Sequence, residues 1–198
     1  DNPWVFDLKA RQMGGTTGIA AYAFWHAYFR PNFRVGVMAQ SRESAEQIFE
    51  IYKRFYDNLP QWLQFPTEKS NVREMAFFHG GMVRVFTANT QSARGTTYNF
   101  LHCSEFAFYS DVESTVRAVF QTATPDAIVV METTANGLNH AHQLWVDKNG
   151  YGKVFLPWML SEEYSLKERP YAWRGPMTKW HAYGEEHNLT KEQLWWAF

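Results

Sequence analysis

A glycine-containing segment near the start of the chain, Lys9 to Gly18, carries the residue types that bind phosphate. The apolar run Trp4 to Leu8 precedes it and the Ala- and aromatic-rich run Ile19 to Phe29 follows it, which predicts a strand, a turn and a helix. The first N–H groups of a helix are unpaired and its dipole adds partial positive charge, so both favour an anion. Glycine lets the backbone approach phosphate oxygens, and a Thr hydroxyl can ligate Mg²⁺. We expect a phosphate cradle here; the plainer alternative is an ordinary glycine turn.

The segment departs from the common phosphate-loop pattern G-x-x-x-x-G-K-[ST] at one place. That pattern has a lysine directly before the Ser or Thr, whereas Gly15 stands directly before Thr16. Two cations, Lys9 and Arg11, stand at the front of the segment instead, and a loop that curls around the phosphates would bring them close. The alternative is a pair of solvated charges at the end of a strand.

Polar residues also follow two further apolar runs. The run 99–103 is followed by Ser104 and Glu105, and the run 127–131 by the segment 132–137. Buried parallel strands are continuous apolar runs, and open α/β sheets bind ligands at the carboxyl ends of their strands. We therefore expect the polar segments at one edge of a sheet, with Glu105 as a catalytic acid rather than only a cap of the next helix.

Strand and helix patterns alternate along the chain. Strands are expected at 4–8, 34–39, 99–103, 127–131 and 153–156, a hairpin at 74–86, and helices at 16–29, 41–59, 112–122 and 138–148. This alternation predicts an α/β fold, with a mostly parallel sheet flanked by helices. From Pro157 onward the strand pattern stops, so we expect a core domain at 1–156 and a small helical lid or linker at 157–198.

Composition narrows the class of protein. The formal net charge is −1, so no overall positive field attracts nucleic acid, and any DNA contact must come from a local patch or from an assembly. One cysteine, Cys103, allows no disulfide within the chain and indicates a reducing compartment. Its neighbour His102 would point to the opposite face of the same strand, so we expect core packing for both rather than a metal site. We find no signal peptide or membrane span, and expect a soluble intracellular domain of a longer protein.

Taken together, the motifs resemble the ATPase domain of the large terminase subunit, the DNA-packaging motor of tailed bacteriophages. The resemblance covers essentially the whole chain and rests mainly on four segments in order, 9–17, 92–96, 101–107 and 132–137. It implies a P-loop NTPase-like fold and hydrolysis of ATP with Mg²⁺. It also implies double-stranded viral DNA, the portal protein and the small terminase subunit as partners. The implied assembly is a homo-oligomeric ring, with a monomer in isolation, in the host cytoplasm and without a membrane.

The resemblance also implies roles for individual residues. Those expected to hold ATP are Lys9, Arg11, Gln12, Met13, Gly14, Gly15, Thr16 and Thr17. Those expected to act in catalysis are Glu105, Arg11 and Arg94; those expected at Mg²⁺, through water for the serine, are Thr16 and Ser104. Those expected to couple hydrolysis to movement are Thr133, Thr134 and Asn136. For Arg94 the sequence does not decide between an arginine finger, a DNA contact and a plain surface charge.

Two departures from the family pattern keep other functions open. First, Gly15 stands where the usual lysine would be, and Lys9 at the front of the motif is the basic residue instead. Second, Ser104 stands where the usual Walker B aspartate would be, which removes a charge from the metal site. One alternative is a helicase-like DNA-remodelling ATPase of the same broad fold. The other is a degenerate nucleotide-binding module that is structural and does not hydrolyse ATP. We expect no nuclease activity from this chain.

Overall fold

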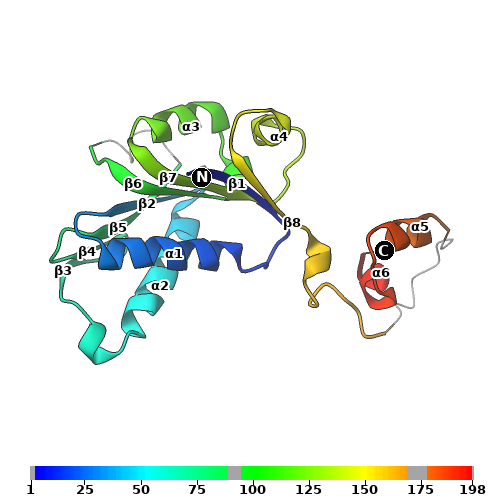
Figure 1. The fold of residues 1–198 in the computed structure, drawn as a ribbon, viewed down its shortest axis with the longest axis horizontal. Coiled ribbons are helices and arrows are strands. Elements are labelled where there is room, and N and C mark those ends of the chain that lie inside the picture. Colours follow the sequence, from blue (N-terminus) through cyan, green and yellow to red (C-terminus); the bar gives the residue numbers. More distant parts are fainter. Residues whose placement is uncertain (1–2, 89–94, 169–177, 198) are drawn as a thin grey trace. The chain divides into compact units, whose positions relative to one another are not determined.

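The fold was analysed in a computed structural model, which describes residues 3–88, 95–168 and 178–197 (Figure 1). Its strands are β1 (Trp4–Lys9), β2 (Arg34–Ala39), β3 (Thr67–Ser70), β4 (Glu74–Phe77), β5 (Met82–Thr87), β6 (Tyr98–Ser104), β7 (Ala123–Thr133) and β8 (Gly152–Leu156). Its α-helices are α1 (Gly15–Phe29), α2 (Arg42–Asp57), α3 (Val112–Phe120), α4 (His140–Val146), α5 (Thr178–Glu186) and α6 (Lys191–Ala197). Short 3₁₀ turns are η1 (Gln61–Leu63), η2 (Phe106–Phe108) and η3 (Trp158–Leu160).

One sheet of eight strands organises the fold, in the order β3-β4-β5-β2-β6-β7-β1-β8. The pairs β5–β2, β2–β6, β6–β7 and β7–β1 are parallel, whereas β3–β4 and β4–β5 are antiparallel. The α/β class, the mostly parallel sheet and the flanking helices are therefore confirmed. The edge strand β3 was not expected, and β7 begins at Ala123, four residues before the predicted start.

Helices cover both faces of the sheet, with α1 and α2 on one face and α3 and α4 on the other (Figure 1). Each face has its own core: one includes Phe24, Tyr28 and Phe49, and the other includes Phe6 and Met131. The central strands are apolar on both faces because both are covered, which is why they are continuous apolar runs in the sequence.

The starts of α1 and α2 are fixed by local sequence. Gly14 has φ 71° at the N-cap of α1, a left-handed conformation that glycine adopts without a steric penalty. At α2 the side chain of Ser41 accepts a hydrogen bond from the backbone N–H of Ser44, 3.1 Å away, as an N-cap does. Both helices therefore begin directly after the carboxyl end of a strand, β1 and β2 respectively.

The chain divides into two compact units, Asp1–Phe155 and Leu156–Phe198. Aromatic rings pack within the second unit: the ring of Trp158 lies 5.3 Å from that of Trp196, and Tyr164 lies 4.6 Å from Trp196. Leu194 on α6 is buried. None of the helices in the described ranges is both long and apolar enough to cross a membrane.

Candidate functional site

The predicted phosphate-binding segment forms a tight turn between β1 and α1. Gln12 (φ 55°) and Gly14 (φ 71°) are both left-handed, and the N–H of Gly18 donates to the carbonyl of Gly14 at 3.0 Å to close the first turn of α1. Left-handed residues in succession with helical ones can aim backbone N–H groups toward a common point, which suits an anion. The segment therefore has the backbone form that a phosphate cradle needs.

A cavity of about 410 Å³ opens beside this turn. Its lining residues are Lys9, Arg11, Gln12, Thr16, Gln40, Glu105, Phe108 and Thr134. They come from the carboxyl ends of β1, β2, β6 and β7, so the strand order brings together segments that are far apart in the sequence. Six of the eight are predicted site residues; Gln40 and Phe108 are new.

The side chain of Lys9 is buried beside two carboxylates. Its ammonium lies 3.2 Å from Glu132 Oε2 and 3.7 Å from Glu105 Oε1, and its side chain is only 6% exposed. A Cβ at Gly15 would lie 2.9 Å from Lys9 Cδ and 3.3 Å from Asp7 Oδ2, which is too close for the lysine stem to pass. Gly15 is therefore a steric requirement of the Lys9 side chain.

Glu132 is the centre of a buried polar cluster behind the cavity. Its side chain has no exposed surface, and it accepts hydrogen bonds from Thr16 Oγ1 at 3.0 Å and from Ser104 Oγ at 2.9 Å. His102 Nε2 lies 3.0 Å from the same oxygen as Ser104. Burial would raise the pKa of Glu132, but the hydrogen bond and charge of His102, the charge of Lys9 and the hydrogen bond from Thr16 outweigh it and lower the pKa to about 2. The carboxylate is therefore ionised at neutral pH.

Asp7 adds a second buried carboxyl group to this cluster. It lies directly opposite Glu132 in the β1–β7 pairing and is 6% exposed. Burial and then the charge of Glu132 raise the pKa of Asp7, while Lys9 and His102 oppose the rise. Lys9 contacts both Glu132 and Glu105. Together with Asp7, three carboxyl groups therefore share the one lysine ammonium of the cluster.

Glu105 is held in an unusual backbone conformation at the mouth of the cavity. It has φ 51° and ψ 42°, a left-handed geometry that costs about 1–2 kcal/mol in a residue with a side chain. One of its carboxylate oxygens faces Lys9, and the other accepts hydrogen bonds from the backbone N–H of Thr134 at 3.4 Å and from Thr134 Oγ1 at 3.3 Å. This arrangement fixes the carboxylate toward the space where a phosphate would lie.

The predicted coupling residues fasten the end of β7 to the turn that follows Glu105. Thr133 Oγ1 accepts from the N–H of Ala107 at 3.1 Å and donates to the carbonyl of Thr134 at 2.8 Å. The amide groups of Asn136 and Asn139 both donate to the carbonyl of Ala107, at 2.9 and 2.8 Å. Hydrogen bonds therefore join the segment 133–139 to Glu105 and to the turn that follows it.

Some predicted site residues lie away from the cavity. The cavity is not lined by Met13 and Gly14 of the turn, by Gly15 and Thr17 at the start of α1, or by Thr133 and Asn136. Arg94 lies outside the described residues. Ser104 is 4% exposed and lies behind Glu132 rather than at the cavity surface.

The cavity offers oxygen ligands that suit Mg²⁺. Thr16 and Glu105 present a hydroxyl and a carboxylate to it. In the ranges that the structure describes, no three His, Cys, Asp or Glu side chains gather as a self-sufficient metal site. Mg²⁺ is usually held by one or two protein oxygens together with substrate phosphates and water, so the residues present fit an ion that arrives with a nucleotide. This geometry favours Thr16 over Ser104 as the protein ligand.

Sequence reasoning missed the buried half of the site. His102 is fully buried, in keeping with the expected core packing, but its contact with Glu132 was not expected; that contact arises because β7 brings a carboxylate to the same face. Asp7 lies within the apolar run 4–8, and Glu132 lies at the end of the apolar run 127–131. Charged residues are rarely buried without partners, so these positions were a signal that could have identified both. Gln40 directly follows β2, as Glu105 directly follows β6, so the same strand-end argument applies to it.

Comparison with known proteins gives a family for the chain. The family described as terminase large subunit, T4likevirus-type, N-terminal, matches residues 8–181. Similar solved structures include the large terminase of a thermophilic bacteriophage, with 14% identity, a TM-score of 0.63, and coverage of 85% of this chain and 43% of that one. That same terminase has been solved with ADP and with ATP-γ-S.

Two further structures have the same fold. The ATPase domain of the large terminase of Thermus phage P74-26 has 15% identity and a TM-score of 0.56, over 79% of this chain and 75% of that one. The large terminase of bacteriophage HK97 has 15% identity and a TM-score of 0.62, over 93% of this chain and 43% of that one. The chain thus spans less than half the length of two of these relatives. Its sequence match over residues 8–181 and its fold place it in the family of phage large terminase subunits, in their N-terminal part.

Proposed function

We propose that this chain binds ATP with Mg²⁺ in the cavity beside the β1–α1 turn and hydrolyses it. The observation that carries the proposal is the convergence of Lys9, Arg11 and Thr16 with Glu105 and Thr134 around one cavity. Cations, a helix start, a carboxylate and a sensing threonine are the parts that phosphoryl transfer to water requires. The complexes of a structural relative with ADP and ATP-γ-S support a nucleotide as the ligand.

Each residue would contribute a distinct part of the chemistry. Lys9, Arg11 and the backbone N–H groups of the turn would bind the phosphate oxygens, and Thr16 would ligate Mg²⁺. The ion, when bound, neutralises charge on the phosphates. Glu105 would orient and polarise the attacking water, and Thr134, which contacts it now, would register the loss of the terminal phosphate.

We further propose that hydrolysis drives double-stranded viral DNA into a capsid. Membership in the large terminase family supports this, as does the hydrogen-bonded link from Glu105 through Thr134 to the segment 133–139. In the whole protein we expect a ring of subunits that works with the portal protein and the small terminase subunit in the host cytoplasm. Such a ring would form a channel that surrounds DNA, which a single chain of net charge −1 does not supply.

The direct test is Glu105→Gln, with phosphate release and ATP binding measured side by side. Loss of a general base should lower the hydrolysis rate about 10²- to 10⁴-fold while ATP affinity changes little. Glu113→Gln is the matched control, because Glu113 is exposed on α3 and its ion pair within the described ranges is with Arg117. Equal hydrolysis by Glu105→Gln and the unchanged chain would refute the catalytic assignment. ATP binding without hydrolysis by the unchanged chain would favour a structural nucleotide-binding module instead.

A further inference from the structure

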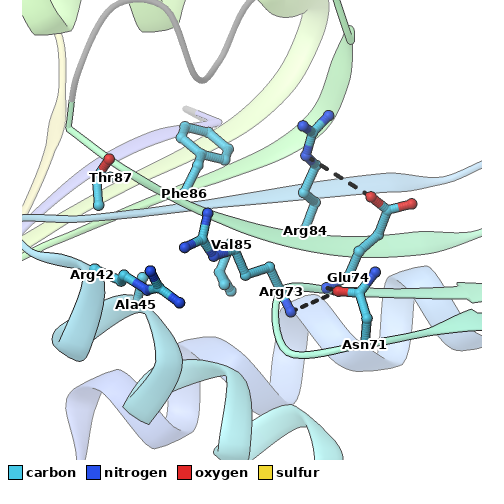
Figure 2. A pocket seen from close by; sticks show the side chains of 9 residues that line it. All are labelled: Arg42, Ala45, Asn71, Arg73, Glu74, Arg84, Val85, Phe86 and Thr87. Carbon is cyan, nitrogen blue, oxygen red and sulfur yellow. Dashed lines mark hydrogen bonds and ion pairs between the residues drawn. The ribbon is translucent and has the colours of Figure 1, made fainter.

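A second cavity, of about 290 Å³, lies at the carboxyl end of β5 (Figure 2). Its lining residues are Arg42, Ala45, Asn71, Arg73, Glu74, Arg84, Val85, Phe86 and Thr87. Three of these nine carry a guanidinium and one carries a carboxylate. For a chain whose formal net charge is −1, this is a local concentration of positive charge, one of the two sources of DNA contact that the sequence leaves open.

The cavity exists because β4 is shorter than its partner. β4 begins at Glu74, opposite Arg84, so the last residues of β5 extend beyond it. Arg73, the residue before β4, contacts this end of β5: its carbonyl accepts a hydrogen bond from the N–H of Val85 at 2.8 Å. The first turn of α2 closes the other side with Arg42, as Figure 2 shows. Three separate elements therefore contribute arginines to the lining, with Arg84 on the opposite face of β5 from Arg42 (Figure 2).

The positive charges are only partly compensated. Arg42 pairs with Glu46 at 2.8 Å on its own helix, whereas Arg84 lies 4.0 Å from Glu74 and donates to Thr96 Oγ1 at 3.4 Å. Glu74 is also shared with a lysine outside the cavity, at 3.0 Å. No ion pair of Arg73 is found within the described part of the chain, and its side chain is exposed. The cavity therefore has a surplus of guanidinium donors and room for an anion.

We propose that this cavity binds a backbone phosphate of double-stranded DNA, an inference that rests on the proposed function. Guanidinium groups present paired N–H donors that match phosphate oxygens, and phosphate contacts supply the sequence-independent part of DNA affinity. The start of α2 adds partial positive charge to the same space. A motor that moves along DNA of any sequence needs contacts of this kind rather than contacts to base edges.

The cavity is also joined to the nucleotide site by a short piece of chain. Gln40 lines the nucleotide cavity and Arg42 lines the arginine cavity, with the N-cap Ser41 between them. The two cavities are therefore lined by residues that stand two positions apart in the sequence.

The test is binding of a fluorescent DNA duplex by the 198-residue chain and its Arg73→Ala variant over a series of salt concentrations. Arg73 has the simplest surroundings of the three arginines, so its removal leaves the ion pairs of Arg42 and Arg84 intact. We expect about tenfold weaker binding at low salt, and a log–log salt slope smaller by about 0.9, the value for one phosphate contact. Arg73→Lys should restore part of the affinity, and Arg117→Ala, which removes an exposed arginine of α3, should change neither quantity.

Each outcome separates the inference from the function on which it rests. Unchanged duplex binding by Arg73→Ala, while the chain itself binds, would overturn the cavity as a DNA site and leave the motor proposal standing. No duplex binding by the chain, with Mg²⁺-dependent ATP hydrolysis intact, would overturn the DNA site and leave only the ATPase. If Arg73→Ala weakens ATP binding instead, the cavity serves the nucleotide and the inference is wrong.

Discussion

Replacement of Glu132 by glutamine would test the buried cluster on which the nucleotide site rests. The substitution keeps the shape but removes the charge, and it turns one acceptor oxygen into an NH₂ group. Donors approach both oxygens of Glu132: Ser104 approaches one, and Thr16 and Lys9 approach the other. The amide must therefore face one set of donors with its own N–H groups, and Lys9 loses its nearest counter-charge.

The magnitude follows from the pKa of Glu132. The fall from its ordinary value of 4.5 to about 2 corresponds to about 3 kcal/mol of stability, at about 1.4 kcal/mol per pH unit. Because the pKa is lower in the folded state, this stability is fully present above pH 4.5 and is lost as the pH falls through about 2. Removal of one member of a buried ion pair costs a similar amount, about 3–5 kcal/mol.

Urea unfolding of the chain and of Glu132→Gln at several pH values measures this directly. We expect the variant to be less stable by about 3 kcal/mol at pH 7, and the difference to shrink to about half near pH 3. Glu113→Gln, which breaks only an exposed pair, should stay within about 0.5 kcal/mol of the unchanged chain. A loss below about 1 kcal/mol at pH 7, or a difference that does not vary with pH, would refute this account of the cluster.

Two further predictions concern packing around the site. Gly15→Ala should destabilise the chain by about 1–3 kcal/mol and weaken ATP binding, because its methyl group would lie 2.9 Å from the Lys9 stem. Gly18→Ala, with no atom within 4 Å of its new Cβ, should instead raise stability by up to about 1 kcal/mol; thermal unfolding compares the two, and equal effects would contradict the steric argument. Burial raises the pKa of Cys103 to about 12, so a thiol reagent at pH 8 should label it only after unfolding, and rapid labelling of the folded chain would be inconsistent with its position.

The sequence was sufficient for the central fold because each central strand is an apolar run bounded by polar residues. It was not sufficient for β3, whose residues Thr67–Ser70 are polar and largely exposed at the edge of the sheet. The early start of β7 was hidden by Pro125 and Asp126, which are typical of a turn. Hydrophobic periodicity detects strands that are buried, and it is weak where a strand lies at an edge or extends past the core.

For the site, the sequence predicted strand ends but not strand neighbours. Glu105 could be singled out because it directly follows a recognisable strand, and Thr16 because it lies at the start of a recognisable helix. The roles of Asp7, His102 and Glu132 depend on β6, β7 and β1 being adjacent in that order, which sets Glu132 opposite both Asp7 and Ser104. Strand order is a property of the whole sheet, so no local pattern contains it.

The contact between Lys9 and Gly15 also constrains how such a site can change in evolution. A side chain at position 15 collides with the Lys9 stem, so a lysine cannot simply be added at the usual place. Loss of Lys9 alone leaves Glu132 and Glu105 without their shared cation. Transfer of the lysine from position 9 to position 15 therefore requires a substitution at each position. Each substitution alone would be harmful, and the effect of both together would differ from the sum of their separate effects. In a chain with this geometry, a site with the lysine at the end of β1 and a site with the lysine before the threonine would thus be separated by an epistatic barrier.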